Sequence, residues 1–393
     1  MNQLDDFKAR VCAAIDDRRD LLVGVSHELH ANPELAFDEH HAHQVLTDAL
    51  EAEGISVERR AYGLPTAFVA RKGTGTPTVA ILCEYDALPQ IGHACGHNII
   101  ASAGLGAGLA LAEVVEEAGG SVVVMGTPAE EGGGGKVIMI DAGAFDGIDA
   151  AMMVHPGGLD IAAMTTIAVH PCTVEYFGDA SHASAAPEKG RNALDGAILG
   201  YNAVAALRQH IASDERIHGI ISHGGDKPNI VPKYAAADWL VRSPDLASLA
   251  ILKDRFTKVL QGAADAALCE MSITWNDTPY SDMIDSHTMI GAYAANASTL
   301  GRTAPIPDGH NSIMGSTDMG NVSYEVPSIH PMIKVAPDDI AIHTPEFERY
   351  AGESSGDEGV IDGAKMMAMT AIDLWLDPSV MAATQAEFAR SVP

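Results

Sequence analysis

Short apolar runs alternate with longer amphipathic segments along the first part of the chain. Each run is almost continuously hydrophobic and is bounded by turn residues, which is typical of a strand buried on both faces of a sheet. We expect such strands at residues 78–83, 121–125 and 150–154. Helical periodicity predicts helices at residues 3–31, 38–53, 99–118 and 136–142. The alternation of strands and helices predicts an α/β sandwich with a largely parallel sheet.

The pattern changes after about residue 168 and returns to α/β character from about residue 285. Between these points the expected order is strand, helix, strand, strand, helix, strand, at residues 173–177, 192–210, 219–222, 234–242, 244–267 and 271–275. This is the order of a ferredoxin-like α+β domain with an antiparallel sheet. The sequence therefore predicts an α/β domain of residues 1–168 and 285–393, interrupted by an inserted ferredoxin-like domain of residues 169–284.

The composition narrows the classes of partner and compartment. The chain has 24 Lys and Arg against 53 Asp and Glu, a formal net charge of −29, which repels nucleic acid and anionic lipid surfaces. Its five cysteines are scattered and odd in number, which argues against a disulfide framework and favours a reducing compartment, the cytoplasm. We find neither a secretory signal nor an apolar run that approaches about 18 residues without charge, so no membrane span is expected.

One segment concentrates side chains that bind metal ions. His93, Cys95 and His97 lie within five residues, just after an expected strand. A thiol and an imidazole two positions apart can turn their donor atoms towards one point, which suits Zn²⁺ or a similar borderline metal ion. The alternative for this segment alone is a tight turn with a buried thiol.

Further candidate ligands follow the next two expected strands. Glu130 and Glu131 close one of these strands, and His155 directly follows the other. Because the carboxyl ends of parallel strands meet at one edge of a sheet, these side chains should converge with Cys95. Adjacent carboxylates are usually a solvated edge, but the glycines at residues 132–135 allow a ligand to approach the backbone closely here. One carboxylate of the pair can bind a metal ion while the other takes a proton from water.

Two groups of residues have competing interpretations. Cys95 could be the nucleophile of a cysteine hydrolase with a histidine base. We favour Cys95 as a metal ligand, because a thiolate that bridges two soft cations also offsets their mutual repulsion. His40, His41 and His43 lie at helical spacing on a polar stretch, and we interpret them as a solvated helix face rather than a metal cluster.

Taken in order, these motifs resemble the family of dinuclear-metal aminoacylases and carboxypeptidases. Within that family the chain is most similar to the branch with hippurate hydrolase, auxin-conjugate amidohydrolases, aminobenzoyl-glutamate hydrolase and β-alanyl-lysine dipeptidase. The matching segments span nearly the whole chain, at residues 29–35, 84–89, 93–98, 127–131, 181–184, 190–193, 229–232, 242, 315–323 and 343–345. The resemblance implies a metal-dependent amidohydrolase that cleaves an N-acyl amino acid or a dipeptide with a metal-activated water molecule.

The resemblance also implies a role for each matching residue. Two divalent ions, Zn²⁺ or Mn²⁺ with Co²⁺ or Ni²⁺ also compatible, should be bound by Cys95, His97, Glu131, His155 and His343. Glu130 should be the general base, and Asp86 a carboxylate that orients a ligand. His182 should stabilise the oxyanion, reaching from the inserted domain into the site of a partner subunit. Asn229 and Arg242 should hold the terminal carboxylate of the substrate, for which a bidentate guanidinium is suited.

The same resemblance implies that residues 1–168 and 285–393 form the catalytic metal-binding domain. Residues 169–284 should form a lid that also joins two chains in a homodimer. The expected partner is a small amide or dipeptide, and neither nucleic acid nor a membrane. Glu84 and Asn98 stand where many relatives have Asp, so this chain offers no carboxylate at position 98, and the five expected ligands are unaffected. Two alternatives stay open: a catalytically silent metal- or ligand-binding homologue, and a cysteine hydrolase acting through Cys95.

Overall fold

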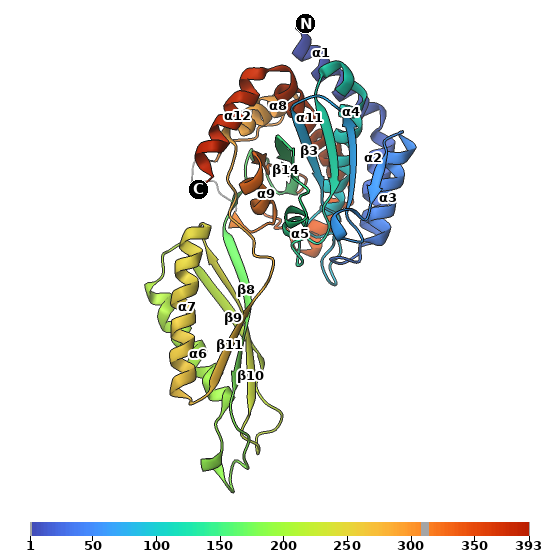
Figure 1. The fold of residues 1–393 in the computed structure, drawn as a ribbon. Helices are drawn as coiled ribbons and strands as arrows, with labels where there is room; N and C mark the ends of the chain where they lie inside the picture. The colour runs from blue at the N-terminus through green and yellow to red at the C-terminus, as the bar shows by residue number, and fades with distance from the viewer. Residues whose placement is uncertain (1, 308–313, 393) are drawn as a thin grey trace. The chain divides into compact units, whose positions relative to one another are not determined.

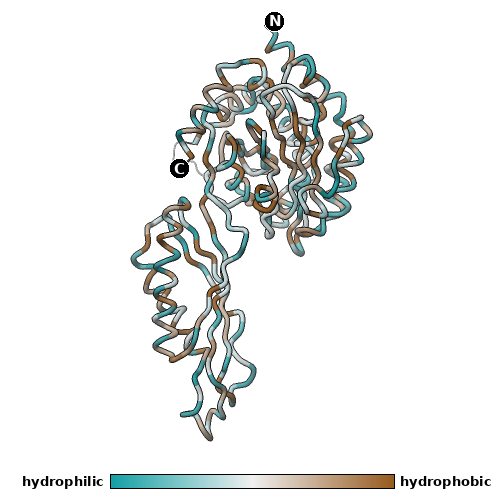
Figure 2. Tube along the Cα trace, in the orientation of Figure 1, coloured by the Kyte–Doolittle hydropathy of each residue, from teal (hydrophilic) through white to brown (hydrophobic). Residues whose placement is uncertain are grey.

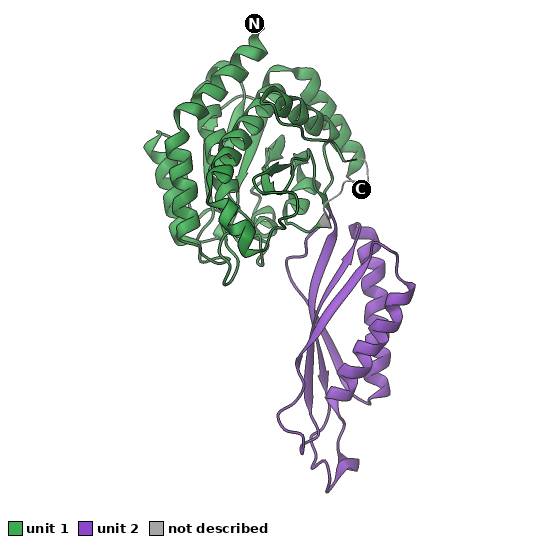
Figure 3. Cartoon of the chain, turned by 180° about the vertical axis from the view of Figure 1, so that it is seen from behind, with its two compact units in different colours: residues 1–165, 283–393 green, residues 166–282 purple. Residues whose placement is uncertain are grey.

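The computed structural model describes residues 2–307 and 314–392, and the chain divides into two compact units (Figure 3). Unit 1 comprises Met1–Thr165 and Met283–Pro393, and unit 2 comprises Thr166–Asp282. Unit 2 is therefore inserted into unit 1. The division falls after residues 165 and 282, whereas the sequence predicts it after residues 168 and 284. The functions expected for the two domains stay predictions.

Unit 1 is built around a six-stranded sheet with the strand order β1-β2-β4-β3-β5-β13 (Figure 1). Its strands are β1 (Val57–Arg59), β2 (Phe68–Gly73), β3 (Thr78–Cys83), β4 (Ser121–Gly126), β5 (Ala150–Met152) and β13 (Ser328–Ile329). Neighbours in the series β4, β3, β5 and β13 are parallel, whereas β1 and β2 extend the sheet antiparallel. Every residue of β4 is buried, and so is every residue of β3 after Thr78. The predicted α/β sandwich with a largely parallel sheet is confirmed.

Helices cover both faces of this sheet. Alternate residues of β3 and β4 therefore belong to two different hydrophobic clusters, one on each face. The helices of unit 1 are α1 (Gln3–Asp17), α2 (Arg19–Ala31), α3 (His40–Ala52), α4 (His97–Ala118), α5 (Gly135–Asp141), α8 (His287–Thr299), α9 (Met319–Glu325), α10 (Pro345–Ala351), α11 (Ser354–Leu376) and α12 (Pro378–Ser391). Short elements are β6 (His155–Gly157), β7 (Thr165–Thr166), β12 (Met314–Gly315), β14 (Met332–Lys334) and the 3₁₀ turn η1 (Ala61–Gly63). In Figure 2, brown marks hydrophobic residues and follows the central strands of the sheet.

Helix α4 lies directly on the sheet and begins at the predicted ligand His97. A Cβ at Gly108 would lie 2.2 Å from Val124 Cγ2, and one at Gly104 would lie 2.6 Å from Cys83 Sγ, so both glycines permit this close approach. Among the described helices, α4 alone has the length and composition to cross a membrane. However, 89% of its most apolar window is buried within the protein, which is the environment of a core helix.

Unit 2 is a four-stranded sheet with two helices packed on one face (Figure 1). Its elements are β8 (Ala168–Phe177), η2 (Pro187–Lys189), α6 (Ala193–Leu207), η3 (Arg208–His210), β9 (Arg216–His223), β10 (Tyr234–Ser243), α7 (Leu246–Ala266) and β11 (Glu270–Trp275). The strand order in space is β11-β8-β10-β9, and every neighbouring pair is antiparallel. The predicted ferredoxin-like α+β domain is confirmed.

Two local predictions are wrong. The periodic segment at residues 3–31 forms two helices, because the chain turns at Arg18 between α1 and α2. His43 does not lie on a solvated face: it is 8% exposed, and its ring centroid lies 6.0 Å from that of Phe68. In α3 it shares a side with Leu46 and Leu50, the apolar side of the helix, and this packing outweighs the polar character of its neighbours.

Candidate metal centre

The predicted metal ligands of unit 1 meet at the carboxyl ends of its central strands. These ends lie at one edge of a parallel sheet, so loops that are distant in sequence become neighbours there. His343 reaches the same place from the loop before α10, where its N–H donates to the carbonyl oxygen of Ala94 over 2.8 Å. Several groups of three potential ligands have all their donor atoms within 4.8 Å of one another. Three of these groups are Cys95 with His97 and His155, Cys95 with Glu131 and His343, and His97 with Glu130 and Glu131.

Two of these groups share the thiol of Cys95. In one, Cys95 Sγ lies 3.4 Å from His155 Nε2, and His97 completes the group. In the other, His343 Nε2 lies 3.3 Å from Cys95 Sγ and 3.3 Å from Glu131 Oε1. A thiol that belongs to two adjacent groups of donors has the position of a ligand that bridges two cations.

A buried carboxylate orients two of the candidate ligands. Asp86 Oδ1 accepts a hydrogen bond from His97 Nδ1 at 3.0 Å, and Asp86 Oδ2 accepts one from the backbone N–H of Glu131 at 2.9 Å. The first bond leaves His97 Nε2 as the atom available for coordination. His155 is oriented in the same way, because its Nδ1 donates to the carbonyl oxygen of Pro156 at 2.7 Å.

The donor set fits a divalent metal ion. His97 Nε2 is buried and has no hydrogen-bond partner among the described residues. An unpaired buried polar atom costs about 1–3 kcal/mol, and coordination to a cation would remove that cost. Sulfur, imidazole nitrogen and carboxylate oxygen together are the ligands that Zn²⁺ prefers, and Mn²⁺, Co²⁺ and Ni²⁺ also accept them.

Electrostatics distinguish two of the acidic side chains beside His97, Glu130 and Asp86. Burial raises the pKa of the Glu130 carboxyl well above its ordinary value, and the negative charges of Glu84 and Asp318 raise it further. Burial acts on Asp86 as well, but the hydrogen bond from His97 and its charge hold the pKa of Asp86 below the ordinary value. Asp86 therefore acts as a fixed acceptor, whereas a bound cation would be needed to favour the ionised form of Glu130.

Beside Glu130 lies a buried ion cluster that the sequence did not lead us to predict. Lys136 Nζ lies 2.5 Å from Glu84 Oε1 and 2.5 Å from Asp318 Oδ1, and none of the three side chains is more than 1% exposed. Burial alone would lower the pKa of Lys136, but the charges of Asp318 and Glu84 raise it, so the ammonium group is a permanent cation. Glu84 Oε2 also lies 3.6 Å from His97 Nε2. The available signal was a lysine directly after the glycines at residues 132–135.

Two further polar residues lie near the candidate ligands. Asn98 Nδ2 donates to Ser26 Oγ at 2.9 Å and to the carbonyl oxygen of Ala351 at 3.0 Å, so this amide ties α4 to α2 and α10. The ring centroid of His330 lies 5.5 Å from that of His155, and neither of its ring nitrogens has a hydrogen-bond partner among the described residues. Burial first, and then the charge of His155, lowers the pKa of His330 well below its ordinary value, so this imidazole is neutral.

The predicted substrate-binding residues of unit 2 do not converge within that unit. His182 and Asn229 lie at one end of the sheet, where His182 forms a β-bridge with Ile230. Arg242 lies near the far end of β10, and the stretch from Tyr234 to Arg242 spans about 26 Å at about 3.3 Å per residue. Side chains this far apart in one rigid sheet cannot hold the same small carboxylate.

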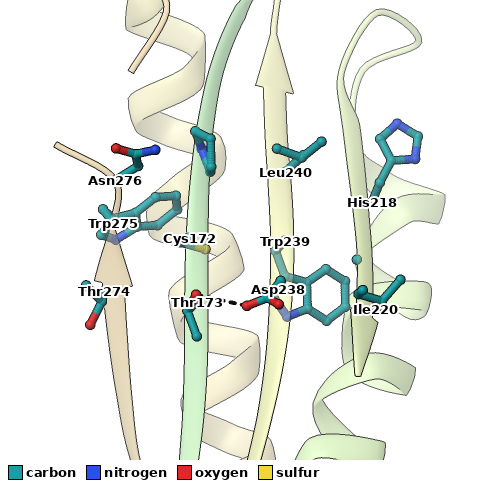
Figure 4. Close-up of a pocket in the computed structure, with 12 residues that line it drawn as sticks. Cys172, Thr173, His218, Ile220, Asp238, Trp239, Leu240, Thr274, Trp275 and Asn276 are labelled. Carbon is teal, nitrogen blue, oxygen red and sulfur yellow. Dashed lines mark hydrogen bonds between the residues drawn. The ribbon is translucent and has the colours of Figure 1, made fainter. Parts of the chain in front are cut away.

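Unit 2 also has a hollow on the sheet face opposite its helices (Figure 4). Its volume is about 560 Å³, and Leu240, Ile220 and Trp275 contribute to its lining. Thr173 Oγ1 donates to Asp238 Oδ1 at 2.9 Å within it. The groups of three or more potential metal ligands found among the described residues all lie in unit 1, so the hollow is not a candidate metal site.

The fold and the ligand set define a metallohydrolase, in which strand ends of an α/β sandwich present thiol, imidazole and carboxylate donors next to a buried acid. The model of the peptidase family M20/M25/M40 matches residues 80–372, and the chain belongs to this family. The family resemblance expected from the motifs is thereby confirmed, and the protein is a metallo-amidohydrolase that uses divalent metal ions.

Relatives and solved structures match almost the whole chain. It is 39% identical to the Xaa-Arg dipeptidase of Mus musculus over 401 residues, which cover 98% of this chain and 93% of that protein. It is 28% identical to a p-aminobenzoyl-glutamate hydrolase subunit of Escherichia coli (strain K12), with 95% of this chain and 93% of that protein covered. A dinuclear metal-binding peptidase of the M20 family from Bacillus subtilis shares the fold, with a TM-score of 0.71 at 19% identity over 92% of this chain and 99% of that chain.

The buried ion cluster generates a prediction about stability. Lys136→Met should lower the free energy of unfolding by about 3–5 kcal/mol, because it leaves Glu84 and Asp318 buried without their counter-charge. Urea unfolding followed by circular dichroism measures the change. The matched control is Lys334→Met, whose partner Asp338 is 78% exposed, and it should change stability by no more than about 0.5 kcal/mol. Equal effects of the two substitutions would contradict the prediction.

Proposed function

We propose that this chain hydrolyses amide bonds with two divalent ions, Zn²⁺ or Mn²⁺, bound by Cys95, His97, Glu131, His155 and His343. The observation that carries the proposal is the pair of ligand groups that share Cys95. Five donors can serve two ions when one of them bridges, and Cys95 Sγ has imidazole nitrogens at 3.4 Å and 3.3 Å in the two groups.

In the proposed mechanism the ions supply Lewis-acid activation of water and of the scissile carbonyl group. Glu130 takes a proton from the attacking water and passes it to the departing amine. Its place among the ligands supports this role, because its carboxylate lies within 4.8 Å of donor atoms of His97 and Glu131. Asp86 keeps these two ligands oriented through its hydrogen bonds.

Residues of unit 2 bind the substrate in this proposal. His182 donates a hydrogen bond to the oxyanion, and Asn229 and Arg242, supplied by two different chains, hold the terminal carboxylate. Support for the role of His182 comes from a contact of its ring, in which Nδ1 accepts the backbone N–H of Ala185 at 3.2 Å. A ring that accepts at Nδ1 carries its proton on Nε2, and the residue is exposed, so this N–H is available as a donor.

We propose a homodimer in which His182 and Asn229 of one chain serve the metal site of the other. The separation of these residues from Arg242 along β10 supports two different chains as their source. A second observation supports contact through unit 2. Of the eleven exposed large hydrophobic side chains among the described residues, nine lie in unit 2: Phe177, Ile198, Leu199, Ile220, Ile221, Ile230, Leu240, Ile251 and Leu268. Two of them, Ile220 and Leu240, line the hollow on the sheet face opposite the helices, and apolar side chains gathered on one face are typical of a protein interface.

As substrates we propose dipeptides with a basic C-terminal residue. The first support is the 39% identity, over 98% of this chain, to a protein named Xaa-Arg dipeptidase. The second is electrostatic: a chain with a net charge of −29 attracts a cationic substrate and repels one with additional negative charge. Aminobenzoyl-glutamate and acidic dipeptides should therefore be poorer substrates.

The cysteines support both the ligand role of Cys95 and a cytoplasmic location. All five are free, as expected in a reducing compartment. Burial raises the pKa of the Cys95 thiol well above its usual value. A thiol of this kind is a weak nucleophile in the absence of a cation, which disfavours a cysteine hydrolase.

The role of Glu130 is tested by an isosteric substitution. Glu130→Gln should lower kcat on an Xaa-Arg dipeptide by about 10²–10⁴-fold, because the amide cannot take the proton. Metal content, measured by plasma mass spectrometry, should stay at two ions per chain. The control Glu116→Gln, at an exposed position of α4, should leave kcat unchanged. Full activity of Glu130→Gln would contradict its assignment as the base.

Removal of the metal separates the proposal from its alternatives. Dialysis against a chelator should abolish hydrolysis, and Zn²⁺, Mn²⁺ or Co²⁺ should restore it, with Xaa-Arg dipeptides preferred over aminobenzoyl-glutamate and N-acyl amino acids. Activity that survives chelation but is lost on alkylation of Cys95 would establish the cysteine hydrolase. A protein that binds metal but hydrolyses none of these compounds would be a silent homologue.

Mixing of two inactive variants tests the shared site. Glu130→Gln and His182→Ala homodimers should both be inactive, whereas a co-expressed mixture should recover about a quarter of wild-type activity. The reason is that half of the dimers combine the two variants, and each of these has one intact site. A mixture that stays inactive while forming mixed dimers would show that His182 serves its own chain.

A further inference from the structure

Ala129, the residue before the two adjacent glutamates, has an unusual backbone conformation. Its φ of 61° lies in the left-handed region that residues with a Cβ rarely adopt. Its carbonyl oxygen accepts hydrogen bonds from the N–H of Gly133 at 3.0 Å and of Gly134 at 2.9 Å, so Glu130 and Glu131 lie inside a closed turn. The conformation of Ala129 thus sets the direction in which the loop after β4 carries both glutamates.

A buried carboxylate from a different part of unit 1 holds this residue. Glu39 Oε1 accepts the N–H of Ala129 at 2.9 Å, and Glu39 Oε2 accepts the hydroxyl of Thr66 at 2.8 Å. Glu39 immediately precedes α3 and is 0% exposed. Burial of a carboxylate is unfavourable unless hydrogen bonds replace its water. An apolar side chain would pack better at this buried position, so the presence of Glu39 indicates that a hydrogen-bond acceptor is required there.

The same hydrogen-bonded chain reaches the loop that carries Asp86. The hydroxyl of Tyr85 donates to the carbonyl oxygen of Thr66 at 2.6 Å, and Tyr85 immediately precedes Asp86. Asp86 in turn accepts the N–H of Glu131 at 2.9 Å. Glu39 therefore takes part in fixing both loops that converge on the candidate metal ligands.

We infer that Glu39 is a positioning residue for the hydrolytic reaction, because through Ala129 it holds Glu130 and Glu131 in the orientation that proton transfer and metal binding need. The inference rests on the proposed function, in which Glu130 is the base and Glu131 a ligand. Without Glu39, Ala129 relaxes to a negative φ, and rotation of its peptide turns both glutamates away. A displacement of about 1 Å at such groups costs on the order of 100-fold in rate.

The first test compares two substitutions of Glu39. Glu39→Leu should lower kcat by at least about tenfold and change KM by less than about threefold, whereas Glu39→Gln, whose amide oxygen still accepts the Ala129 N–H, should keep kcat within about threefold. The matched control is Glu34→Leu. Glu34 accepts the N–H of His41 at 3.0 Å and of Ala42 at 2.9 Å in the same segment, so its loss should weaken α3 without lowering kcat.

A second substitution separates positioning from folding. Glycine adopts the φ of 61° without strain, so adding Ala129→Gly to Glu39→Leu should recover at least about threefold in kcat. Ala129→Gly alone should change kcat by less than about threefold. Cobalt-loaded protein gives a readout that does not depend on turnover: its visible absorption bands should shift in Glu39→Leu and return to the wild-type positions in Glu39→Gln.

The inference is overturned if Glu39→Leu lowers only the unfolding temperature, while kcat and the cobalt spectrum of the folded protein match wild type. If Glu39→Leu does not fold, Thr66→Val replaces it, because loss of this hydroxyl also releases Glu39, and a kcat equal to wild type would then be the contrary result. An active Glu130→Gln protein would contradict the proposed function instead. The cobalt spectrum would still report whether Glu39 holds the turn that contains Glu130 and Glu131.

Discussion

The carboxylate of Asp86 connects the parts of the metal centre. One oxygen holds the imidazole of His97, and the other holds the main chain at Glu131, so a single group links the loops that follow β3 and β4. Its pKa stays below the ordinary value in spite of burial, because His97 donates to the ionised form. Both oxygens therefore remain acceptors at neutral pH. The placement of His97 relative to Glu131 follows from this shared anchor as much as from the sheet beneath it.

The surroundings of the site carry more negative charge than the neighbouring cationic side chains neutralise. Five carboxylates gather at the strand ends: Glu84, Asp86, Glu130, Glu131 and Asp318. Lys136 contacts two of them directly. Burial and neighbouring charge raise the pKa of Asp318 to about 6 and that of Glu130 further above its ordinary value. A divalent cation bound among these carboxylates would offset their charge and favour the ionised form of Glu130.

The rigidity of the inserted unit sets the distance between its predicted substrate-binding residues. Its four-stranded sheet is stiff, because strands of up to ten residues are paired along their length and backed by α6 and α7. Stiffness of this kind keeps His182 and Arg242 at opposite ends of the unit. In the proposed homodimer, the residues at the two ends of this sheet therefore come from two different chains.

Much of the fold and most of the ligand set follow from local properties of the sequence. Hydrophobic periodicity depends only on neighbouring residues, so the buried strands, the ferredoxin-like order and the chemical types of the ligands were predictable. Contacts between distant segments were not: Lys136 meets a carboxylate 182 residues away, and Glu39 meets Ala129 across 90 residues. The sequence by itself thus determined which elements form and which donors are present. Only the tertiary structure decided that Lys136 contacts Glu84 and Asp318, that His43 is buried and that Ala129 is held at a positive φ, because these depend on packing between segments far apart in the chain.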